Sequence, residues 1–502
     1  MKTIGLDIGT TTISAVLLDT VTKQVMVVKT IPNTTTVESS HTFEKMQDAD
    51  LILKQCQVLL AEIFVAFPQE RIAGIGVTGQ MHGILYVDAM GNAVSPLYTW
   101  QDQRGNQIYD RQKMSAALSA KADSEYPVNL LTNQDKLSAN FSTEEQSYAA
   151  FAQGVTGYHL ATGFGAVTHF YHSVNGSLPE NATCFCTVAD FVAMKLAGLV
   201  KPLVHPSMAA SMGLFNLQEK CFDQLAVEKL QLQMEYFPEV KGEECWLGQT
   251  KEGIGVTIAL GDNQASFLGA VHSCVKSKTT WDIAGRTFAE CGGDQELDQL
   301  SENVVLLNIG TGSQISIFSE QLGTVQTGEY RPYLKDNFLW AGSPLCGGYS
   351  YHILKEFFTE TLQIFGATPN VDIYEAMNQV GKSLYDTMET TALVVDTRFK
   401  GTRENPDCLG NIMNIAEETW RPNHLILGFL KGICRELYEY HQAFLNSDND
   451  YILVGSGNGL RKNPLLRQIC SDMFGKELIM SALTEEAACG SAFLAAIIPR
   501  SF

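Results

Sequence analysis

The sequence predicts an α/β fold made of two related domains. Three observations support this: the chain has 502 residues, more than one hydrophobic core usually holds, strand-like apolar runs alternate with helical patterns, and one motif occurs twice. The motif reads LDIGTTTISAVLLD at residues 6–19 and LNIGTGSQISIF at residues 307–318. Each copy places Ile-Gly-Thr between two apolar runs, which predicts one strand-turn-strand hairpin in each domain.

The first half of the chain contains strand patterns followed by helical patterns. Three short strands are expected within residues 3–31, and a helix is expected over 47–66, where apolar residues recur at three- and four-residue spacing. A buried strand is expected at 72–79, and helical patterns return near 186–198 and 222–232. This order is typical of a layered α/β fold.

The domain boundary is expected at 245–253, where turn residues interrupt the apolar pattern. This gives an N-terminal domain over residues 1–250 and a C-terminal domain over residues 251–502. The polar stretch 110–148 and the Gly- and acid-rich stretch 280–302 are predicted to be surface insertions.

Composition narrows the classes of function. The formal net charge of -20 argues against binding to nucleic acid or to an anionic membrane. No apolar run reaches the length of a membrane span, and the first residues lack the pattern of a signal peptide. The 12 cysteines are scattered without the spacing of a zinc or redox site, as expected for reduced thiols. We therefore expect a cytoplasmic protein.

The two hairpin turns are candidate phosphate-binding loops. Glycine lacks a Cβ atom, so backbone N–H groups can approach an anion closely, and threonine hydroxyls add donors. One such turn is more often plain structure, but a pair, one per domain, predicts phosphates held between two facing domains. The candidate residues are Gly9, Thr10, Thr11 and Thr12 in the first hairpin and Gly310, Thr311, Gly312 and Gln314 in the second.

Asp7 and Asn308 occupy matching positions before the two turns. A carboxylate beside phosphates can hold Mg²⁺, usually through water, whereas an amide adds no charge. The difference predicts that Asp7 serves a metal ion and that Asn308 does not. The alternative, a turn-capping role for Asp7, fits less well with its position inside an apolar strand.

Two polar and aromatic segments follow strand patterns: TGQMHG at 78–83 and TWQDQRG at 99–105. Their composition suits a polyhydroxylated ligand, because polar groups bind hydroxyls and a ring face covers C–H surface. For the histidine alone, a structural role is an equal alternative. The overlapping GIGVTG at 74–79 matches a dinucleotide-binding fingerprint, but its glycines lie inside the strand and no helix pattern follows. The candidate ligand-binding residues are Gln80, Met81, His82, Trp100, Asp102 and Arg104.

The stretch IGVTIALGDNQASFLGA at 254–270 predicts a strand that ends in Gly-Asp and a helix that begins at Gln264. Asp262 thus stands at the carboxyl end of a strand, where α/β sheets place their chemistry. Its carboxylate could take the proton of a hydroxyl group as the oxygen attacks a γ-phosphate, and a plain helix N-cap is the alternative. Farther along, ILVGSGNGLRKNP at 452–464 predicts a strand, a Gly-rich turn and a helix, where a base or ribose could lie against the backbone.

Taken in this order, the motifs resemble those of the FGGY carbohydrate kinases, within the actin, hexokinase and heat-shock chaperone ATPase superfamily. The resemblance covers nearly the whole chain and implies two actin/ribonuclease H-like domains, each a mixed sheet flanked by helices, with an interdomain cleft. It also implies ATP and Mg²⁺, a small-molecule ketose as substrate, Asp262 as the general base and Asp7 at the metal. The nucleotide candidates it adds are Gly455, Gly457, Asn458 and Asn463.

Two further segments, at 159–172 and 207–216, resemble a sedoheptulose-phosphorylating subgroup of that family. That likeness implies phosphorylation of the terminal hydroxyl of sedoheptulose to give sedoheptulose 7-phosphate. Because QMHG at 80–83 is shared with xylulose kinases, a pentulose substrate stays an alternative, as does a non-catalytic nucleotide- or sugar-sensing relative. Two segments depart from the family pattern: 206–211 lacks an acid and an amide, and 401–403 lacks an acid.

Overall fold

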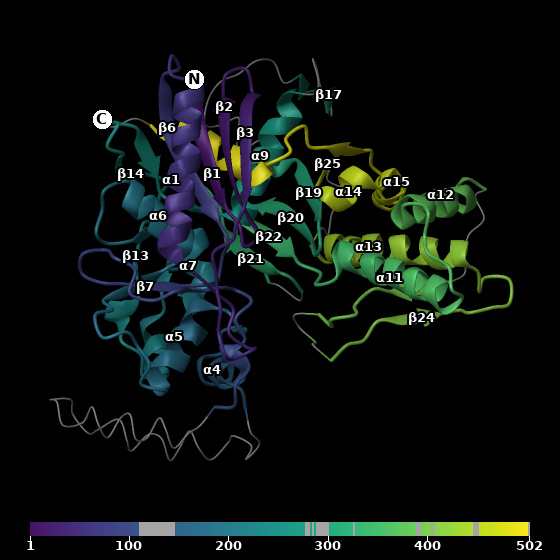
Figure 1. Cartoon of the computed structure of the whole chain (residues 1–502), viewed down its shortest axis with the longest axis horizontal. Helices are drawn as coiled ribbons and strands as arrows, with labels where there is room; N and C mark the ends of the chain where they lie inside the picture. Colours follow the sequence, from purple (N-terminus) through teal and green to yellow (C-terminus); the bar gives the residue numbers. More distant parts are fainter. Residues whose placement is uncertain are drawn as a thin grey trace. The chain divides into compact units, whose positions relative to one another are not determined.

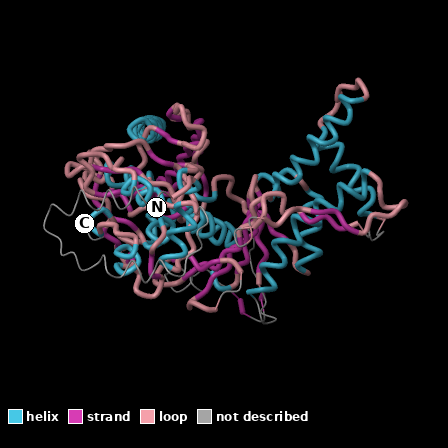
Figure 2. The backbone as a smooth tube through the Cα atoms, turned by 90° about the horizontal axis from the view of Figure 1, so that it is seen from below, coloured by secondary structure: helices cyan, strands magenta, loops and turns pink. Residues whose placement is uncertain are grey.

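The computed structural model describes residues 1–109, 146–276, 282–283, 286–287, 301–324, 327–387, 393–402, 405, 407–444 and 451–499. The chain divides into two compact units, Met1–Ser266 with Ala487–Phe502, and Phe267–Glu486. Each unit combines a mixed β-sheet with helices, which confirms the predicted α/β class (Figures 1 and 2). Most of the expected insertions at 110–148 and 280–302 lies outside the described residues. Within the described ranges, no helix is both long and apolar enough to cross a membrane.

The first unit is built on a seven-stranded sheet. Its first three strands form an antiparallel meander, whereas β6 runs parallel to β1, β15 and β16. The strands expected within residues 3–31 and at 72–79 are therefore confirmed. The members of the sheet are β1 (Lys2–Ile8), β2 (Thr12–Asp19), β3 (Gln24–Pro32), β6 (Ile72–Gly79), β14 (Trp246–Gln249), β15 (Gly255–Thr257) and β16 (Leu260–Gly261).

The predicted domain boundary falls within this sheet. β14 and β15 lie on either side of residue 250, and they pair with each other as antiparallel neighbours. The compact units are defined by packing, and the division of the chain into family domains after residue 250 stays a prediction.

Helices cover both faces of the first sheet. On one face, Ile4, Leu6 and Ile8 are fully buried in a core shared with α1 (Ala49–Ala66) and α6 (Val188–Leu196). These two helices confirm the helical patterns expected at 47–66 and 186–198. Burying branched apolar side chains from both elements is what holds these helices on the sheet.

The other face receives the small-residue helix α16 (Glu486–Ile497), which returns to the first unit from the end of the chain. A Cβ atom on Gly5 would lie 1.7 Å from Ala488 O, and one on Gly76 would lie 1.7 Å from Ser491 O. Gly76 of GIGVTG and Gly5 of the neighbouring strand therefore let a helix approach the sheet closely, so Gly76 has a packing role that needs no dinucleotide.

The rest of the first unit contains one three-stranded sheet, several two-stranded sheets and a second, aromatic-rich core. The helix expected near 222–232 is confirmed as a shorter α8. These elements are β4 (Thr36–Val37), β5 (Met46–Gln47), β7 (Leu85–Val87), β8 (Leu97–Tyr98), α4 (Tyr148–Thr156), α5 (Gly165–Val174), β9 (Cys184–Cys186), β10 (Leu203–Val204), α7 (Pro206–Met212), β11 (Phe215–Asn216), β12 (Cys221–Phe222), α8 (Gln224–Lys229) and β13 (Glu239–Val240).

The second unit repeats the central pairing of the first. In its six-stranded sheet, β19 is antiparallel to β20 and parallel to β25, just as β1 is to β2 and β6. The sheet comprises β19 (Val304–Ile309), β20 (Ser313–Ser319), β21 (Glu329–Pro332), β22 (Phe338–Gly342), β25 (Ile452–Ser456) and β26 (Leu478–Met480). The accompanying elements are α11 (Gly347–Ile364), α12 (Ile373–Asp386), β23 (Val394–Asp396), β24 (Asn411–Met413), α13 (Pro422–Phe444), α14 (Asn458–Lys462) and α15 (Pro464–Phe474).

The close approach of α16 predicts a large effect of one methyl group. Gly76→Ala places a Cβ atom against backbone that cannot rotate away, so we expect a loss of about 3 kcal/mol or more in the free energy of unfolding. Gly242→Ala is the matched control, because its added Cβ would meet no atom within 4 Å. Thermal or urea unfolding of both variants tests this, and equal stability of the two would contradict the packing described.

Candidate active site

Three parallel strands of the first unit end at the same edge of its sheet. β6 pairs with β1 on one side, where Gly79 lies opposite Ile8, and with β16 on the other, where Gly79 lies opposite Gly261. Because all three strands run in the same direction, the residues that follow them leave the sheet together. This register places the first hairpin turn, the TGQMHG segment and Asp262 at one edge.

The first hairpin turn, residues 9–12, is closed and anchored through its backbone. Gly9 N–H donates to Thr12 O at 2.9 Å. Asn33 holds the turn from outside: its Nδ2 donates to Gly9 O at 2.9 Å, and its backbone N–H donates to Thr11 O at 2.8 Å. The side chains of Thr11 and Thr12 are exposed, so the turn keeps two hydroxyl groups at the surface.

Thr10 connects this turn to the expected sugar-binding residues. Its Oγ1 donates to Gln80 Oε1 at 3.2 Å and accepts from Trp100 Nε1 at 2.9 Å. Gln80 Nε2 donates to Gln47 Oε1 at 2.9 Å, and Gln47 Nε2 donates to Thr10 O at 2.8 Å. Thr10, Gln80 and Gln47 thus form a closed hydrogen-bonded ring, the Thr10 ring.

No pattern in the sequence predicted a role for Gln47. It lies in β5, which pairs with β8 so that Gln47 is opposite Leu97, three residues before Trp100. That pairing joins residues about fifty positions apart, and a single glutamine before a helix carries no pattern of its own.

Asp102 and Arg104 form an ion pair that is 0% and 1% exposed. Asp102 Oδ1 accepts from Arg104 Nε at 2.6 Å, and Oδ2 accepts from Arg104 Nη2 and from Lys45 N, both at 3.0 Å. The Arg104 guanidinium also lies 4.1 Å from the centre of the Tyr98 ring. The structure therefore brings these two residues together inside the protein, where they hold the segment that carries Trp100.

His172 completes the surroundings of Arg104. Its Nε2 lies 2.6 Å from Arg104 Nη1, and its Nδ1 lies 2.8 Å from Ser177 Oγ. Burial and the Arg104 charge lower the pKa of His172 to about 3, so the ring is neutral. Because Arg104 can only donate, Nε2 is the acceptor and Nδ1 carries the hydrogen. The residue lies in the segment 159–172, but nothing in the sequence predicted this contact.

His82 is held by the segment that departs from the family pattern. Its backbone has φ 73°, and its N–H donates to Ser211 Oγ at 3.1 Å. Its Nδ1 lies 2.7 Å from the Ser211 carbonyl oxygen, and its ring stacks on Phe164 with centroids 4.6 Å apart. Met81, beside it, is 6% exposed. Segment 206–211 therefore shapes the TGQMHG loop even though it lacks the family's acid and amide.

Asp262 begins helix α9 (Asp262–Lys276), two residues earlier than the sequence predicted. It is half-buried, and its Oδ1 accepts from Asn263 N at 2.7 Å. The preceding Gly261 N–H donates to Ser207 Oγ at 3.0 Å, and Ser207 Oγ lies 2.8 Å from His205 Nδ1. Helix α7, which contains Ser207, thus supports the strand end that carries Asp262.

The hairpin turn of the second unit is also closed by a hydrogen bond from its first glycine, but it is one residue shorter than the first turn, because Ile309 pairs with Ser313 whereas Ile8 pairs with Ile13. Gly310 N–H donates to Gly312 O at 2.9 Å. The N-terminal turn of α11 adds two contacts, from Gly348 N to Gly310 O at 3.0 Å and from Tyr349 N to Thr311 O at 2.9 Å. The side chain of Thr311 is exposed, which leaves its hydroxyl group at the surface.

The Gly-rich turn at the end of β25 lies beside this hairpin. Asn308 is opposite Ser456, and a Cβ atom on Gly457 would lie 2.5 Å from Asn308 Oδ1. Gly457 has φ 85°, a conformation that favours glycine, and Asn458 begins α14 directly after it. The second hairpin, Gly457 and Asn458 therefore gather at one edge.

Three other residues predicted to bind the nucleotide have structural roles. Asn463 is 5% exposed, accepts from Leu466 N at 3.0 Å as the cap of α15, and donates to Asn378 Oδ1 at 2.9 Å. Gln314 Nε2 donates to Ser343 Oγ at 3.0 Å. Gly455 lies inside β25, packed against β26. A nucleotide contact from any of the three stays a prediction.

The candidate metal residue is Asp7. Asp7 is half-buried on β1, opposite Ser14 of β2 and Thr78 of β6. Among the described residues, no group of three or more His, Cys, Asp or Glu side chains could hold a metal ion. Mg²⁺ usually keeps several waters and binds through one or two carboxylates and substrate phosphates. The donor set at Asp7 therefore fits a magnesium ion that arrives with a nucleotide.

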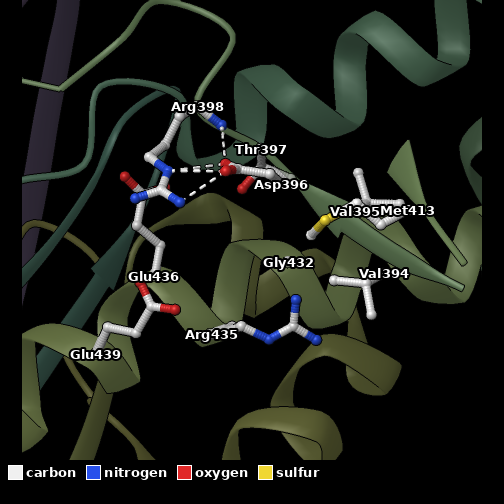
Figure 3. A pocket seen from close by; sticks show the side chains of 10 residues that line it. All are labelled: Val394, Val395, Asp396, Thr397, Arg398, Met413, Gly432, Arg435, Glu436 and Glu439. Carbon is white, nitrogen blue, oxygen red and sulfur yellow. Dashed lines mark hydrogen bonds and ion pairs between the residues drawn. The ribbon is translucent and has the colours of Figure 1, made fainter. Parts of the chain in front are cut away.

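A pocket of about 370 Å³ lies elsewhere in the second unit. Figure 3 shows Asp396 and Arg398 joined by hydrogen bonds on one side, with Val394, Val395 and Met413 on the opposite side. None of the predicted site residues lines this pocket.

Models of two domains from one protein family match the chain. The N-terminal domain of the FGGY family of carbohydrate kinases matches residues 2–135, and its C-terminal domain matches residues 327–498. The chain belongs to the FGGY family of carbohydrate kinases. It is therefore a sugar kinase, as the order of motifs implied.

Individual relatives agree with this assignment. Sedoheptulokinase of Mus musculus is 26% identical over 93% of this chain and 91% of its own length. Xylulose kinase of Staphylococcus xylosus is 20% identical over 98% of this chain and 90% of its own. The structure of Plasmodium falciparum glycerol kinase with ADP matches with a TM-score of 0.72 at 14% identity, covering 99% of this chain and 89% of that one. This last likeness shows the fold.

The Arg104–His172 contact predicts a pH dependence of stability. The pKa of His172 is about 3 in the folded chain and ordinarily 6.5, so the unfolded chain takes up a proton first as the pH falls. The stabilising contribution is present above pH 6.5 and is lost as the pH falls toward 3, by up to about 1.4 kcal/mol per pH unit.

We expect His172→Gln, whose amide oxygen can still accept from Arg104, to remove this part of the slope. Chemical unfolding from pH 7 to pH 4 measures it for both proteins. Parallel pH profiles for wild type and variant would show that burial and the Arg104 charge do not keep His172 neutral.

Proposed function

We propose that the enzyme transfers the γ-phosphoryl group of ATP to the terminal hydroxyl of sedoheptulose, giving sedoheptulose 7-phosphate. The observation that supports this best is the strand register of the first unit, which gathers the first hairpin turn, Gln80 and Asp262 at one sheet edge. A phosphoryl donor, a sugar and a base must meet at one place, and this edge supplies groups suited to each.

Asp262 acts as the general base. The terminal hydroxyl oxygen attacks the γ-phosphorus, its proton passes to the Asp262 carboxylate, and the bond to the β,γ-bridging oxygen breaks to release ADP. The position of Asp262 at the start of α9, just after a strand, keeps the carboxylate at the sheet edge.

The two hairpins offer backbone N–H groups and threonine hydroxyls to the phosphates of ATP, and the turn at Gly457 and Asn458 receives the ribose and base. Mg²⁺, bound at Asp7 through water, would neutralise phosphate charge. The reaction takes place in the cytoplasm, where ATP is available. No helix in the described ranges is long and apolar enough to cross a membrane.

The ketose binds along the TGQMHG and Trp100 segments. Gln80 and His82 supply hydrogen bonds, and the exposed indole ring of Trp100 covers C–H surface. Asp102 and Arg104 are buried as a pair, so they act by positioning this segment rather than by touching the sugar. A pentulose such as xylulose is the second candidate substrate, and the match to a xylulose kinase at 20% identity favours testing it.

The deciding experiment measures ADP release at saturating Mg-ATP with sedoheptulose, D-xylulose, L-ribulose, D-fructose and glycerol. We expect sedoheptulose to give the highest kcat/KM. We also expect Asp262→Asn to lower kcat by about 10²–10⁴-fold, because the hydroxyl then loses its base.

The Asn variant must still be stabilised by ATP in thermal unfolding, which shows that its loss of activity is not a loss of folding. If a pentulose gives the highest kcat/KM, the assigned substrate changes and the proposed mechanism stands. ATP binding without ADP release on any sugar would reject the kinase mechanism in favour of a sensing role.

A further inference from the structure

We infer that the side chain of Thr10 positions the sugar-binding segment and does not bind the phosphates. The three threonines of the first turn then have two tasks: Thr10 ties the turn to the sugar-binding segment, while Thr11 and Thr12 face the nucleotide. This inference rests on the proposed function for the identity of the two substrates, but the division among the threonines comes from the hydrogen bonds alone.

The direction of every bond in the Thr10 ring follows from one fixed point. The Thr10 carbonyl oxygen can only accept, so Gln47 must turn its amide nitrogen toward it and its amide oxygen toward Gln80. Gln80 must then present its amide nitrogen to Gln47 and its amide oxygen to Thr10. The amide orientations, which are ambiguous for an isolated glutamine, are set by this sequence of bonds.

The Thr10 hydroxyl consequently has no hydrogen left to donate. Its single hydrogen goes to Gln80 Oε1, which can only accept, and its oxygen accepts from Trp100 Nε1, which can only donate. A phosphate oxygen needs a donor, and this hydroxyl has no second hydrogen to give. A role at the phosphate would require Thr10 to release Gln80.

Burial makes such a release costly. Gln47 and Gln80 are each 4% exposed, so water cannot readily replace a broken bond in the ring. Thr11 and Thr12, by contrast, are exposed, and within the described part of the chain their hydroxyl groups make no hydrogen bond. The turn therefore holds one committed hydroxyl and two that a ligand can use.

The ring also sets the position of both expected sugar contacts. Gln80 receives one bond from Thr10 and gives one to Gln47, and the Trp100 indole is fixed to Thr10 by its N–H group. Removing the Thr10 hydroxyl leaves Gln80 Oε1 without a donor and frees the indole to rotate. We therefore expect the ketose kcat/KM to fall while ATP binding is kept.

The test compares Thr10→Val with Thr11→Val, two isosteric changes at neighbouring positions of one turn. For Thr10→Val we expect the ketose kcat/KM to fall about tenfold or more, with the KM for ATP changed by less than about twofold. For Thr11→Val we expect the reverse, a rise mainly in the KM for ATP. Thr10→Ser, which keeps the hydroxyl, should restore the wild-type values.

Gln47→Leu supplies an independent check through a buried residue of the ring that the proposed function assigns to neither substrate. We expect it to reproduce the Thr10→Val pattern, and we expect the double variant to lose little more than either single one. A Thr10→Val protein that loses ATP affinity as Thr11→Val does, or that keeps its ketose kcat/KM, would overturn the inference.

A direct binding measurement separates this inference from the proposed function. The dissociation constant of Mg-ATP, obtained by calorimetry without sugar, should be unchanged in Thr10→Val and weakened in Thr11→Val. This holds even if no sugar in the panel is phosphorylated, in which case the proposed function fails and the division among the threonines stands. Equal weakening in both variants would reject the division whatever the substrate.

Discussion

The parallel pairing of β6 with both β1 and β16 is the constraint on which the rest of the site depends. Gly79 is level with Ile8 on one side and with Gly261 on the other, so three strands end together. A shift of one residue in either pairing would turn the following side chains to the opposite face. Gly76 of β6 has a separate role, because it lets α16 pack closely against one face of these strands.

The second unit uses the same construction with different chemistry. β19 pairs antiparallel with β20 and parallel with β25, as β1 does with β2 and β6. Each hairpin turn is closed by a hydrogen bond from its first glycine. The carboxylate of Asp7 is replaced by the amide of Asn308, whose Oδ1 lies against the Gly457 turn. A repeated scaffold thus carries a carboxylate in one hairpin and an amide at the matching position of the other, a difference on which the proposed Mg²⁺ site at Asp7 rests.

Much of the fold followed from local patterns. The strands within residues 3–31 and the helix α1 have regular apolar spacing, and the GIGVTG motif could be separated from a dinucleotide fingerprint because its glycines lie inside a strand. The predicted start of α9 was two residues too late. Strand β16 ends at Gly261 and the helix begins at Asp262, so no turn separates them.

The side-chain partners were harder to predict. Composition placed Asp102 and Arg104 near a polar ligand, but only the fold shows that each satisfies the other inside the protein. Gln47 and His172 had no signal, since a single polar residue acquires its role from distant segments. Segment 206–211 lacks the expected acid and amide, yet its serines accept hydrogen bonds from the backbone of His82 and Gly261. Comparing its residue types with the family pattern could not predict these contacts.

The unequal chemistry of two similar hairpins is tested most directly by the Mg²⁺ dependence of turnover in Asp7→Asn, which gives the first hairpin the side chain of the second. The ketose with the highest wild-type kcat/KM serves as substrate, and Asp50→Asn on the exposed part of α1 is the control. The account predicts that Asp7→Asn lowers kcat by about 100-fold or more and raises the Mg²⁺ concentration for half-maximal rate, while the control matches wild type. An Asp7→Asn enzyme with unchanged kcat and Mg²⁺ requirement would contradict it.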